Sequence, residues 1–197
     1  NHLRDIFAQL ESEGFITRRH GVGTMINHHV LAVNTRMDIE TEFMDIIRQS
    51  GYEPGISRIS MLEEVADPFI AEKLNIPVGT DIVRINRVCT ADGKPAIYCD
   101  DVIDKKLIKH DFMMNDLRAP IFYFLQKFCD IDAYMDLTQF HAVLADDHLS
   151  KVLDIPVGTP LLNLEELDYD IDGNVVFYSK QFFCDNVLDQ TVMRKKL

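Results

Sequence analysis

The spacing of hydrophobic positions changes from helical to alternating within residues 1–26. Apolar side chains recur every three or four positions between residues 2 and 13, which predicts a helix, and Gly14 suits the position just after its last turn. Residues 15–19 and 24–26 predict two short strands joined by the tight turn His20-Gly21-Val22-Gly23. We therefore expect this stretch to fold as a helix followed by a small β-hairpin.

Residues 27–36 show no strong periodicity, and we interpret them as a linker. After the linker, helical and strand-like runs alternate along the chain. Helices are expected at residues 38–50, 67–74, 120–128 and 146–153. Strands are expected at residues 56–61, 81–89, 96–103, 134–145, 161–169 and 175–183. Strands joined by hairpins and interleaved with helices predict an α+β fold, in which helices pack on an antiparallel sheet.

One segment of the chain occurs twice. Leu74-Asn75-Ile76-Pro77-Val78-Gly79-Thr80 returns as Leu153-Asp154-Ile155-Pro156-Val157-Gly158-Thr159, and Asp92-Gly93 returns as Asp172-Gly173. Each copy predicts a helix, a Pro-Gly turn, a strand, an Asp-Gly hairpin turn and a second strand. Two similar hairpins in one sheet imply a pseudo-twofold centre, where equivalent residues can face a shared pocket. We expect a ligand to bind at that centre.

The charge of the chain is acidic and unevenly distributed. The formal net charge is −12, which argues against nucleic-acid binding by the chain as a whole. Residues 1–29 nevertheless hold three arginines against three acidic residues, so the acidic excess belongs to the rest of the chain. Because the sequence begins with Asn1 rather than Met, we expect it to be a fragment of a longer protein.

The cysteines and the apolar segments favour a cytoplasmic protein. The four cysteines form no Cys-x-x-Cys pair, and without a secretory signal we interpret them as reduced thiols. No apolar run approaches the roughly 20 residues that a membrane span needs. We therefore expect no metal site, no cofactor and no membrane association.

A helix followed by a hairpin with basic residues at its tip is typical of the second half of a winged helix-turn-helix. Leu3-Arg4-Asp5-Ile6-Phe7, the run from Leu10 to Ile16, and Arg19-His20-Gly21-Val22-Gly23-Thr24 resemble the DNA-binding domain of GntR-type bacterial transcription regulators. The resemblance covers residues 1–26. It implies DNA contacts by Asn1, His2 and Arg4 in the helix and by Arg19, His20 and Gly21 in the wing. The alternative is a surface hairpin with incidental basic residues.

Further motifs follow the wing in a fixed order. They are Gly51-x-x-Pro54, the two Leu-x-Ile-Pro-Val-Gly-Thr segments, Arg87 followed by Asp92-Gly93-Lys94-Pro95, and Phe182-Phe183 near the end of the last strand. This order resembles the effector-binding domain of the HutC branch of GntR regulators, the UTRA domain, which has the chorismate lyase fold. The resemblance implies that residues 37–197 bind a small-molecule effector within a homodimer.

Arg87, Cys89 and Cys99 form the centre of the predicted effector site. Side chains two apart in a strand share a face, so Arg87 and Cys89 point the same way, and Cys99 is expected to join them from the return strand. The repeat offsets give these residues the following counterparts: Glu166, Asp168 and Ser179. An arginine on a half-buried sheet face needs an anion. That anion is either a ligand phosphate or carboxylate, or the carboxylate of one of these counterparts.

The resemblance also implies what kind of effector is bound, because several positions depart from the family pattern. Family members that bind sugar phosphates usually carry an arginine at the position of Cys89, a glutamate at that of Cys99, and Ser-x-Tyr in place of Pro120-Ile121-Phe122. Fewer anion and hydroxyl partners favour a less polar effector, with one carboxylate held by Arg87. Phe122, Phe140 and the thiols would line its apolar part, and plain core packing of each phenylalanine is the alternative.

Together these features predict a bacterial transcription regulator, a repressor, whose partners are operator DNA and a small-molecule effector. Effector binding between the repeats would change the orientation of the two wings in a homodimer. Two alternatives remain open: a chorismate lyase-like enzyme, which would have no use for the wing, and a dimerisation module that binds no ligand. A thiol sensor formed by Cys89, Cys99 and Cys184 is a further alternative. No nucleophile–base pair or phosphate-binding loop emerges, so we expect no enzymatic activity.

Overall fold

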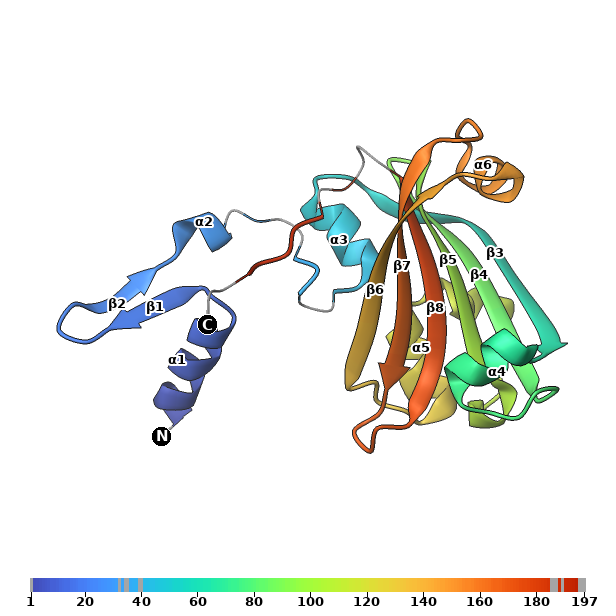
Figure 1. Ribbon diagram of the computed structural model, residues 1–197, viewed down its shortest axis with the longest axis horizontal. Helices are drawn as coiled ribbons and strands as arrows, with labels where there is room; N and C mark the ends of the chain where they lie inside the picture. Colours follow the sequence, from blue (N-terminus) through green and yellow to red (C-terminus); the bar gives the residue numbers. More distant parts are fainter. Residues whose placement is uncertain are drawn as a thin grey trace. The chain divides into compact units, whose positions relative to one another are not determined.

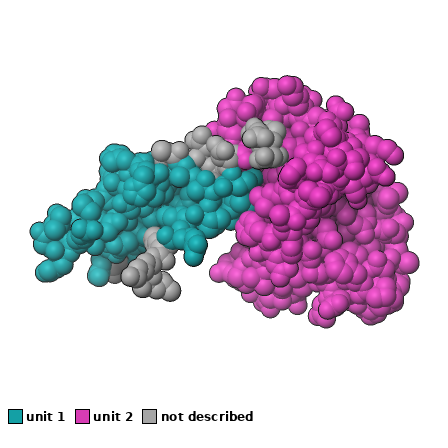
Figure 2. All heavy atoms as spheres, turned by 45° about the horizontal axis from the view of Figure 1, so that its top comes forward, with its two compact units in different colours: residues 1–41, 189–197 teal, residues 42–188 magenta. Residues whose placement is uncertain are grey.

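The computed structural model describes residues 2–31, 33, 36–38, 41–184, 188 and 190–194. The chain divides into two compact units, one formed by residues 1–41 with 189–197 and the other by residues 42–188 (Figure 2). The sequence pattern assigns the last residues of the chain to the ligand-binding domain. The structure instead groups residues 189–197 with the amino-terminal unit.

The smaller unit contains the predicted helix and hairpin (Figure 1). α1 spans His2–Ser12, and β1 (Ile16–Arg19) pairs antiparallel with β2 (Gly23–Ile26). Inside the predicted linker, α2 forms one helical turn at His28–Leu31, which the sequence pattern does not predict. Asn27 begins this turn, because its carbonyl accepts the first backbone hydrogen bond and its side chain donates to the Gly14 carbonyl at 2.7 Å. Residues 32, 34 and 35 of the predicted linker lie outside the described residues.

Arg36 ties the carboxy-terminal segment into the smaller unit. Its backbone forms a parallel β-bridge with Thr191, and the next amide, that of Met37, donates to the Thr191 carbonyl at 2.8 Å. The Arg36 guanidinium donates to the Glu13 carbonyl at 2.6 Å and lies 5.4 Å from the centre of the Phe15 ring. Backbone pairing and cation–π contact therefore join segments that are far apart in the sequence.

The larger unit is built on one antiparallel sheet with the strand order β3-β4-β5-β8-β7-β6 (Figure 1). Its strands are β3 (Pro54–Val65), β4 (Asp81–Ala91), β5 (Lys94–Asp104), β6 (Met135–Leu144), β7 (Pro160–Tyr169) and β8 (Val175–Cys184). Every predicted strand is present, and β3 extends beyond the predicted residues 56–61 at both ends. The predicted α+β fold class is confirmed.

Four α-helices accompany these strands, one before β3 and three between strands: α3 (Phe43–Gln49), α4 (Pro68–Leu74), α5 (Ile121–Cys129) and α6 (Asp147–Leu153). Two 3-10 helices, Lys105–Leu107 and Met114–Arg118, follow β5. α3 begins at Phe43 rather than at the predicted residue 38, and residues 39 and 40 of that prediction lie outside the described residues. Among the described residues, no helix has the length and apolar character that crossing a membrane requires.

The two sequence repeats adopt the same local structure. Asp67 and Asp146 cap α4 and α6, and each carboxylate accepts a backbone amide three residues later at 2.8 Å. Both helices end at a left-handed residue, Asn75 or Asp154. Each proline–glycine turn then places a glycine at positive φ, +84° in the first copy and +82° in the second.

The repeats meet at the pair of central strands, β5 and β8. Asp100 lies opposite Lys180, and the flanking pairs are Cys99 with Gln181 and Asp101 with Ser179. Asp100 and Lys180 are separated by the repeat offset of 80, and the offset exchanges the two flanking pairs, because position 99 corresponds to 179 and position 101 to 181. The predicted pseudo-twofold centre therefore lies between Asp100 and Lys180.

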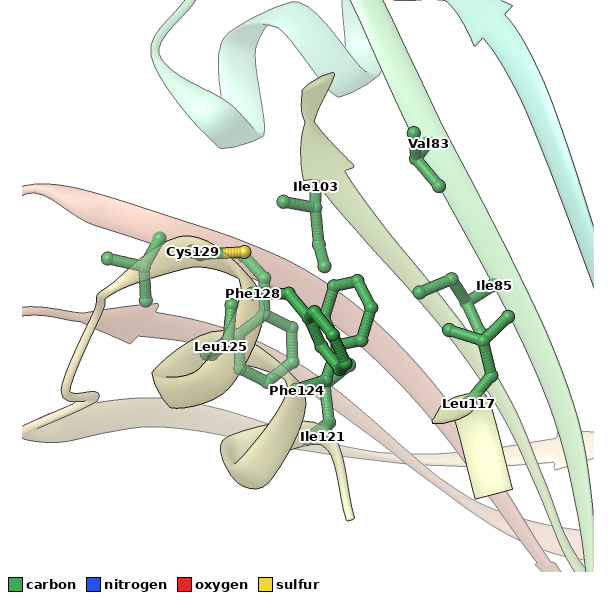
Figure 3. Packing of buried hydrophobic residues seen from close by; sticks show 11 residues of the cluster. Val83, Ile85, Ile103, Leu117, Ile121, Phe124, Leu125, Phe128 and Cys129 are labelled. Atoms are coloured by element: carbon green, nitrogen blue, oxygen red, sulfur yellow. The ribbon is translucent and has the colours of Figure 1, made fainter. Parts of the chain in front are cut away.

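Helices cover both faces of the sheet. On one face, α4 and α6 pack on alternate strand residues that include Ile82, Val102 and Tyr178. On the other, α5 covers the intervening residues, such as Ile85 and Ile103, and Figure 3 shows Phe124 and Phe128 of α5 pointing towards this face of the sheet. α3 also packs against β3 and β4. We call the side covered by α5 the α5 face.

Candidate functional site

Five of the buried polar side chains on the α5 face form a connected group in its middle. They are Arg87 on β4, Asp101 on β5, Glu166 on β7, and Ser179 and Gln181 on β8. Strand alternation places all five on one side, because the register sets Ser179 opposite both Asp101 and Glu166, and Gln181 opposite Cys99. None is more than 9 % exposed. We call this group the central polar cluster.

Asp101 supplies the anion that Arg87 requires. The guanidinium donates from Nη2 to Asp101 Oδ2 at 2.7 Å and from Nη1 to the Ala119 carbonyl at 3.0 Å. Burial acts to lower the pKa of Arg87, but the Asp101 carboxylate together with the neighbouring Cys99 and Cys89 raises the pKa overall. The expectation that Glu166 or Asp168 is the internal partner is wrong. Asp101 could have been found from the sequence, since it lies two residues beyond Cys99 and so shares its face.

The remaining members extend this ion pair into a chain of hydrogen bonds. Ser179 Oγ donates to Asp101 Oδ1 at 2.6 Å, and Gln181 Nε2 donates to Ser179 Oγ at 2.8 Å and to Glu166 Oε2 at 2.5 Å. This series of hydrogen bonds crosses four strands and both repeats. The structure thus brings Arg87, Glu166 and Ser179 together as the repeat offsets indicate, with Gln181 as a member that sequence reasoning missed.

Two glutamates near the cluster hold their protons unusually tightly. Burial, with help from the carboxylates of Asp136 and Asp101, raises the pKa of Glu166 to about 7 against the opposing hydrogen bond from Gln181. Burial likewise raises the pKa of Glu42, just before α3, to about 7, although Arg87 opposes the shift. Nothing in the local sequence indicates that Glu42 lies close to Arg87, because 45 positions separate them in the chain.

Cys89 and Cys99 lie beside Arg87, as predicted. Both thiols are buried. The neighbouring Cys99 thiol, with help from the Arg87 charge, lowers the pKa of Cys89. Cys184 packs with α6 on the opposite face, so the three-thiol sensor is not assembled. Among the described residues, no group of three or more histidine, cysteine or acidic side chains could hold a metal ion.

Phe122 belongs to the apolar core. It packs against the buried cluster under α5, with its ring centre 6.1 Å from that of Phe177. Phe140 instead lies on the edge strand β6, 48 % exposed, in the same cross-strand row as Leu164 and Gln181. Phe140 is therefore an exposed aromatic side chain in the same cross-strand row as one member of the cluster, Gln181.

Two buried atoms of the cluster have no hydrogen-bond partner within the described part of the chain: Arg87 Nε, a donor, and Gln181 Oε1, an acceptor. Arg87 is 5 % exposed and Gln181 is 2 % exposed. A buried polar atom without a partner is costly, and ordered water or a ligand commonly satisfies it. The cluster therefore offers one donor and one acceptor to a bound molecule.

A pocket of about 400 Å³ lies at the end of the sheet, between the end of α4 and the β7–β8 turn. It includes no member of the central polar cluster. Its charged groups already have partners: Lys106 pairs with Asp104 at 2.7 Å, and the Asp170 carboxylate accepts hydrogen bonds from Asn174. We therefore place the candidate site at the cluster, where buried polar atoms remain unpaired.

The predicted DNA-contacting residues lie on the surface of the smaller unit. His2 and Arg4 are exposed on α1, and Arg19 and His20 are exposed at the end of β1 and in the turn that follows. Gly21 has φ +76° in that turn, a conformation that glycine adopts without strain. Asn1 lies outside the described residues.

Comparisons with known proteins agree with this architecture. The sequence model of the UTRA domain family matches residues 49–186. Among solved structures, YydK of Bacillus subtilis, described as a possible transcriptional regulator, superposes with a TM-score of 0.80 at 18% identity, over 98% of this chain and 82% of that one. PhnF of Mycobacterium smegmatis superposes with a TM-score of 0.71 at 18% identity, over 98% of this chain and 84% of that one. A GntR-family transcriptional regulator of Bacillus cereus superposes with a TM-score of 0.60 at 20% identity, over 73% of this chain and 98% of that one. At these identities the structural likeness establishes the fold.

Proposed function

Because the chain belongs to the UTRA domain family, we propose that it is part of a transcription regulator whose residues 42–188 bind a small-molecule effector. The central polar cluster carries this proposal, because it sets two unpartnered polar atoms on the α5 face beside the pseudo-twofold centre. A regulator is favoured over an enzyme because solved structures of the same fold are described as transcriptional regulators.

We assign operator-DNA binding to the smaller unit, acting as part of a winged helix of the HutC branch. Its helix and hairpin present Arg4, Arg19 and His20 to solvent, where they can reach phosphates and base edges. The acidic charge of the rest of the chain restricts DNA contact to this unit. Such a protein acts in the cytoplasm, where its operator lies.

The mechanism that we propose is repression by a homodimer. Two copies bind palindromic half-sites, and an effector that prefers one arrangement of the two wings shifts the population towards that arrangement. Operator affinity then changes by the ratio of effector affinities for the two arrangements.

The nature of the effector needs revision from the sequence-based prediction. That prediction gives Arg87 a ligand carboxylate because a buried guanidinium needs an anion. Since Asp101 meets this need within the chain, no anionic ligand is required. The remaining unpaired atom of Arg87, Nε, is satisfied equally well by a neutral oxygen.

The experiment is a selection of duplex DNA from a random library with the full protein that carries this chain. We expect enrichment of a palindrome, loss of binding in Arg4→Ala and Arg19→Ala, and no change in Arg48→Ala, which removes an exposed arginine of the other unit. Loss of a phosphate contact should also flatten the salt dependence of binding. An absence of enriched sequence, or equal effects of all three substitutions, would contradict the DNA-binding role.

A further inference from the structure

The charge around the central polar cluster is predominantly negative. Among the described residues, the carboxyl groups on this face or acting on its charges are Glu42, Asp101, Asp136, Glu166 and Asp168. The buried cation is Arg87, and two thiols accompany it: Cys89 and Cys99. Arg118, next to the carbonyl that Arg87 contacts, is exposed and donates to the Ile56 carbonyl. The site therefore has more carboxyl groups than cationic groups.

An anionic ligand is disfavoured by this arrangement. To reach Arg87, a carboxylate or phosphate would lie beside Asp101, which already occupies Nη2 at 2.7 Å. Like charges at that separation repel strongly where water is excluded. Two charged groups act most on Glu166. They are Asp136 and Asp101, and both are anionic. An anion would bring a further negative charge into the same space.

The unpartnered atoms specify complementary groups. Gln181 Oε1 needs a donor, and it lies next to Glu166, which its own Nε2 contacts at 2.5 Å. Arg87 Nε needs an acceptor, and it carries the charge that Asp101 balances. An ammonium group satisfies the first requirement with charge-assisted hydrogen bonds, and a neutral hydroxyl or carbonyl oxygen satisfies the second.

We propose that the effector of the central polar cluster is an organic cation, namely a protonated amine that also carries a neutral oxygen acceptor. The ammonium group donates to Gln181 and Glu166, and the oxygen accepts from Arg87. The half-exposed ring of Phe140, in the same cross-strand row as Gln181, offers an aromatic face to the cation or to an apolar substituent. This inference rests on the proposed effector-binding function and names its ligand class.

Binding of such a cation should depend on pH. Glu166, whose pKa lies near 7, must lose its proton to attract an ammonium group. The carboxylate is about one-tenth populated one pH unit below that pKa and about nine-tenths populated one unit above it. The affinity for an amine should therefore rise roughly tenfold between about pH 6 and about pH 8, while the affinity for a neutral alcohol stays constant.

The test is calorimetric titration and thermal shift of the intact chain with amino alcohols, each matched to the carboxylate and the neutral alcohol of the same skeleton. One such set is phenylalaninol, 3-phenylpropionate and 3-phenylpropan-1-ol. The variants are Glu166→Gln, which removes the charge and keeps the shape, and Glu165→Gln as control. Glu165 is the next residue of β7, points to the opposite face and pairs with Lys73 at 2.5 Å.

The proposal is supported if only the amines bind, with an affinity that falls about tenfold in Glu166→Gln and at low pH and does not change in Glu165→Gln. Preferential binding of the carboxylates overturns the amine class and leaves effector binding intact. Equal binding of amines and neutral alcohols also overturns the amine class and leaves effector binding intact. If no compound binds, the amine proposal is overturned, and the effector-binding function loses its support as well.

Discussion

Replacing Asp101 with asparagine should destabilise the larger unit far more than a neighbouring change of the same kind. The substitution keeps the shape of the side chain and removes the charge that balances Arg87, which is buried at 5 % exposure. Removing one partner of a buried ion pair costs about 3–5 kcal/mol, because an uncompensated charge stays in a low-dielectric interior. For a domain of this size, that corresponds to a fall in melting temperature on the order of 10 °C.

Asp100→Asn is the matched control. Asp100 is the preceding residue, and it accepts a hydrogen bond from Arg84 at 2.7 Å on the opposite face of the sheet. Both partners of that pair are partly exposed, at 22–23 %. Water therefore screens the pair, and we expect a loss of about 1 kcal/mol or less.

The assay is urea unfolding at neutral pH with linear extrapolation to water. The double variant Asp101→Asn/Arg87→Met should recover at least half of the lost stability, because it removes the unpaired charge as well. The reasoning is refuted if Asp101→Asn and Asp100→Asn cost the same, or if the double variant is no more stable than Asp101→Asn.

Three further predictions concern pH, helix caps and the core. The pKa of Glu166 is higher in the folded chain, about 7, than its ordinary 4.5, so its stabilising contribution is full below about pH 4.5 and is lost as pH rises through 7. Glu166→Gln should therefore raise stability at about pH 8 by roughly 3 kcal/mol, as measured by urea unfolding across pH. Asp67→Ala and Asp146→Ala should each cost about 1 kcal/mol, since both cap equivalent helices, and their melting temperatures should agree closely. Leu125→Ala, at a fully buried position of α5, should cost about 2–5 kcal/mol in chemical unfolding.

Each of these predictions has an outcome that contradicts it. A Glu166→Gln variant with the same pH profile as the parent would show that this carboxyl titrates normally. Unequal losses from the two cap variants would show that the repeats are not energetically equivalent. A loss below about 1 kcal/mol for Leu125→Ala would mean that the α5 cluster relaxes to fill the space.

Local patterns were enough to predict most of the secondary structure. The strands and helices follow from alternation, helical spacing and the capping residues around the two repeats, all of which act over a few positions. The pseudo-twofold centre also follows from the sequence, because two equivalent hairpins in one antiparallel sheet are related by a local twofold axis, which places Asp100 opposite its equivalent Lys180. The repeat offsets likewise predicted that Arg87, Glu166 and Ser179 lie together.

The tertiary structure decided which side chains and segments contact one another. Strand alternation puts Asp101 on the face of Arg87, but only the sheet register and burial make it the ion-pair partner in place of Glu166 or Asp168. Glu42 acts on Arg87 because α3 packs back on the sheet, and Cys184 faces away from the other thiols because the strand alternates. The carboxy-terminal residues join the amino-terminal unit through a bridge at Arg36.

The sequence by itself thus determined the elements, the repeat and the side chains that share a face, because these depend on backbone geometry within short segments. The tertiary structure alone decided which buried charge is neutralised and which polar atoms remain unpaired. Those outcomes depend on desolvation and on distances between groups far apart in the chain, such as the 2.6 Å contact between Ser179 and Asp101, 78 positions apart.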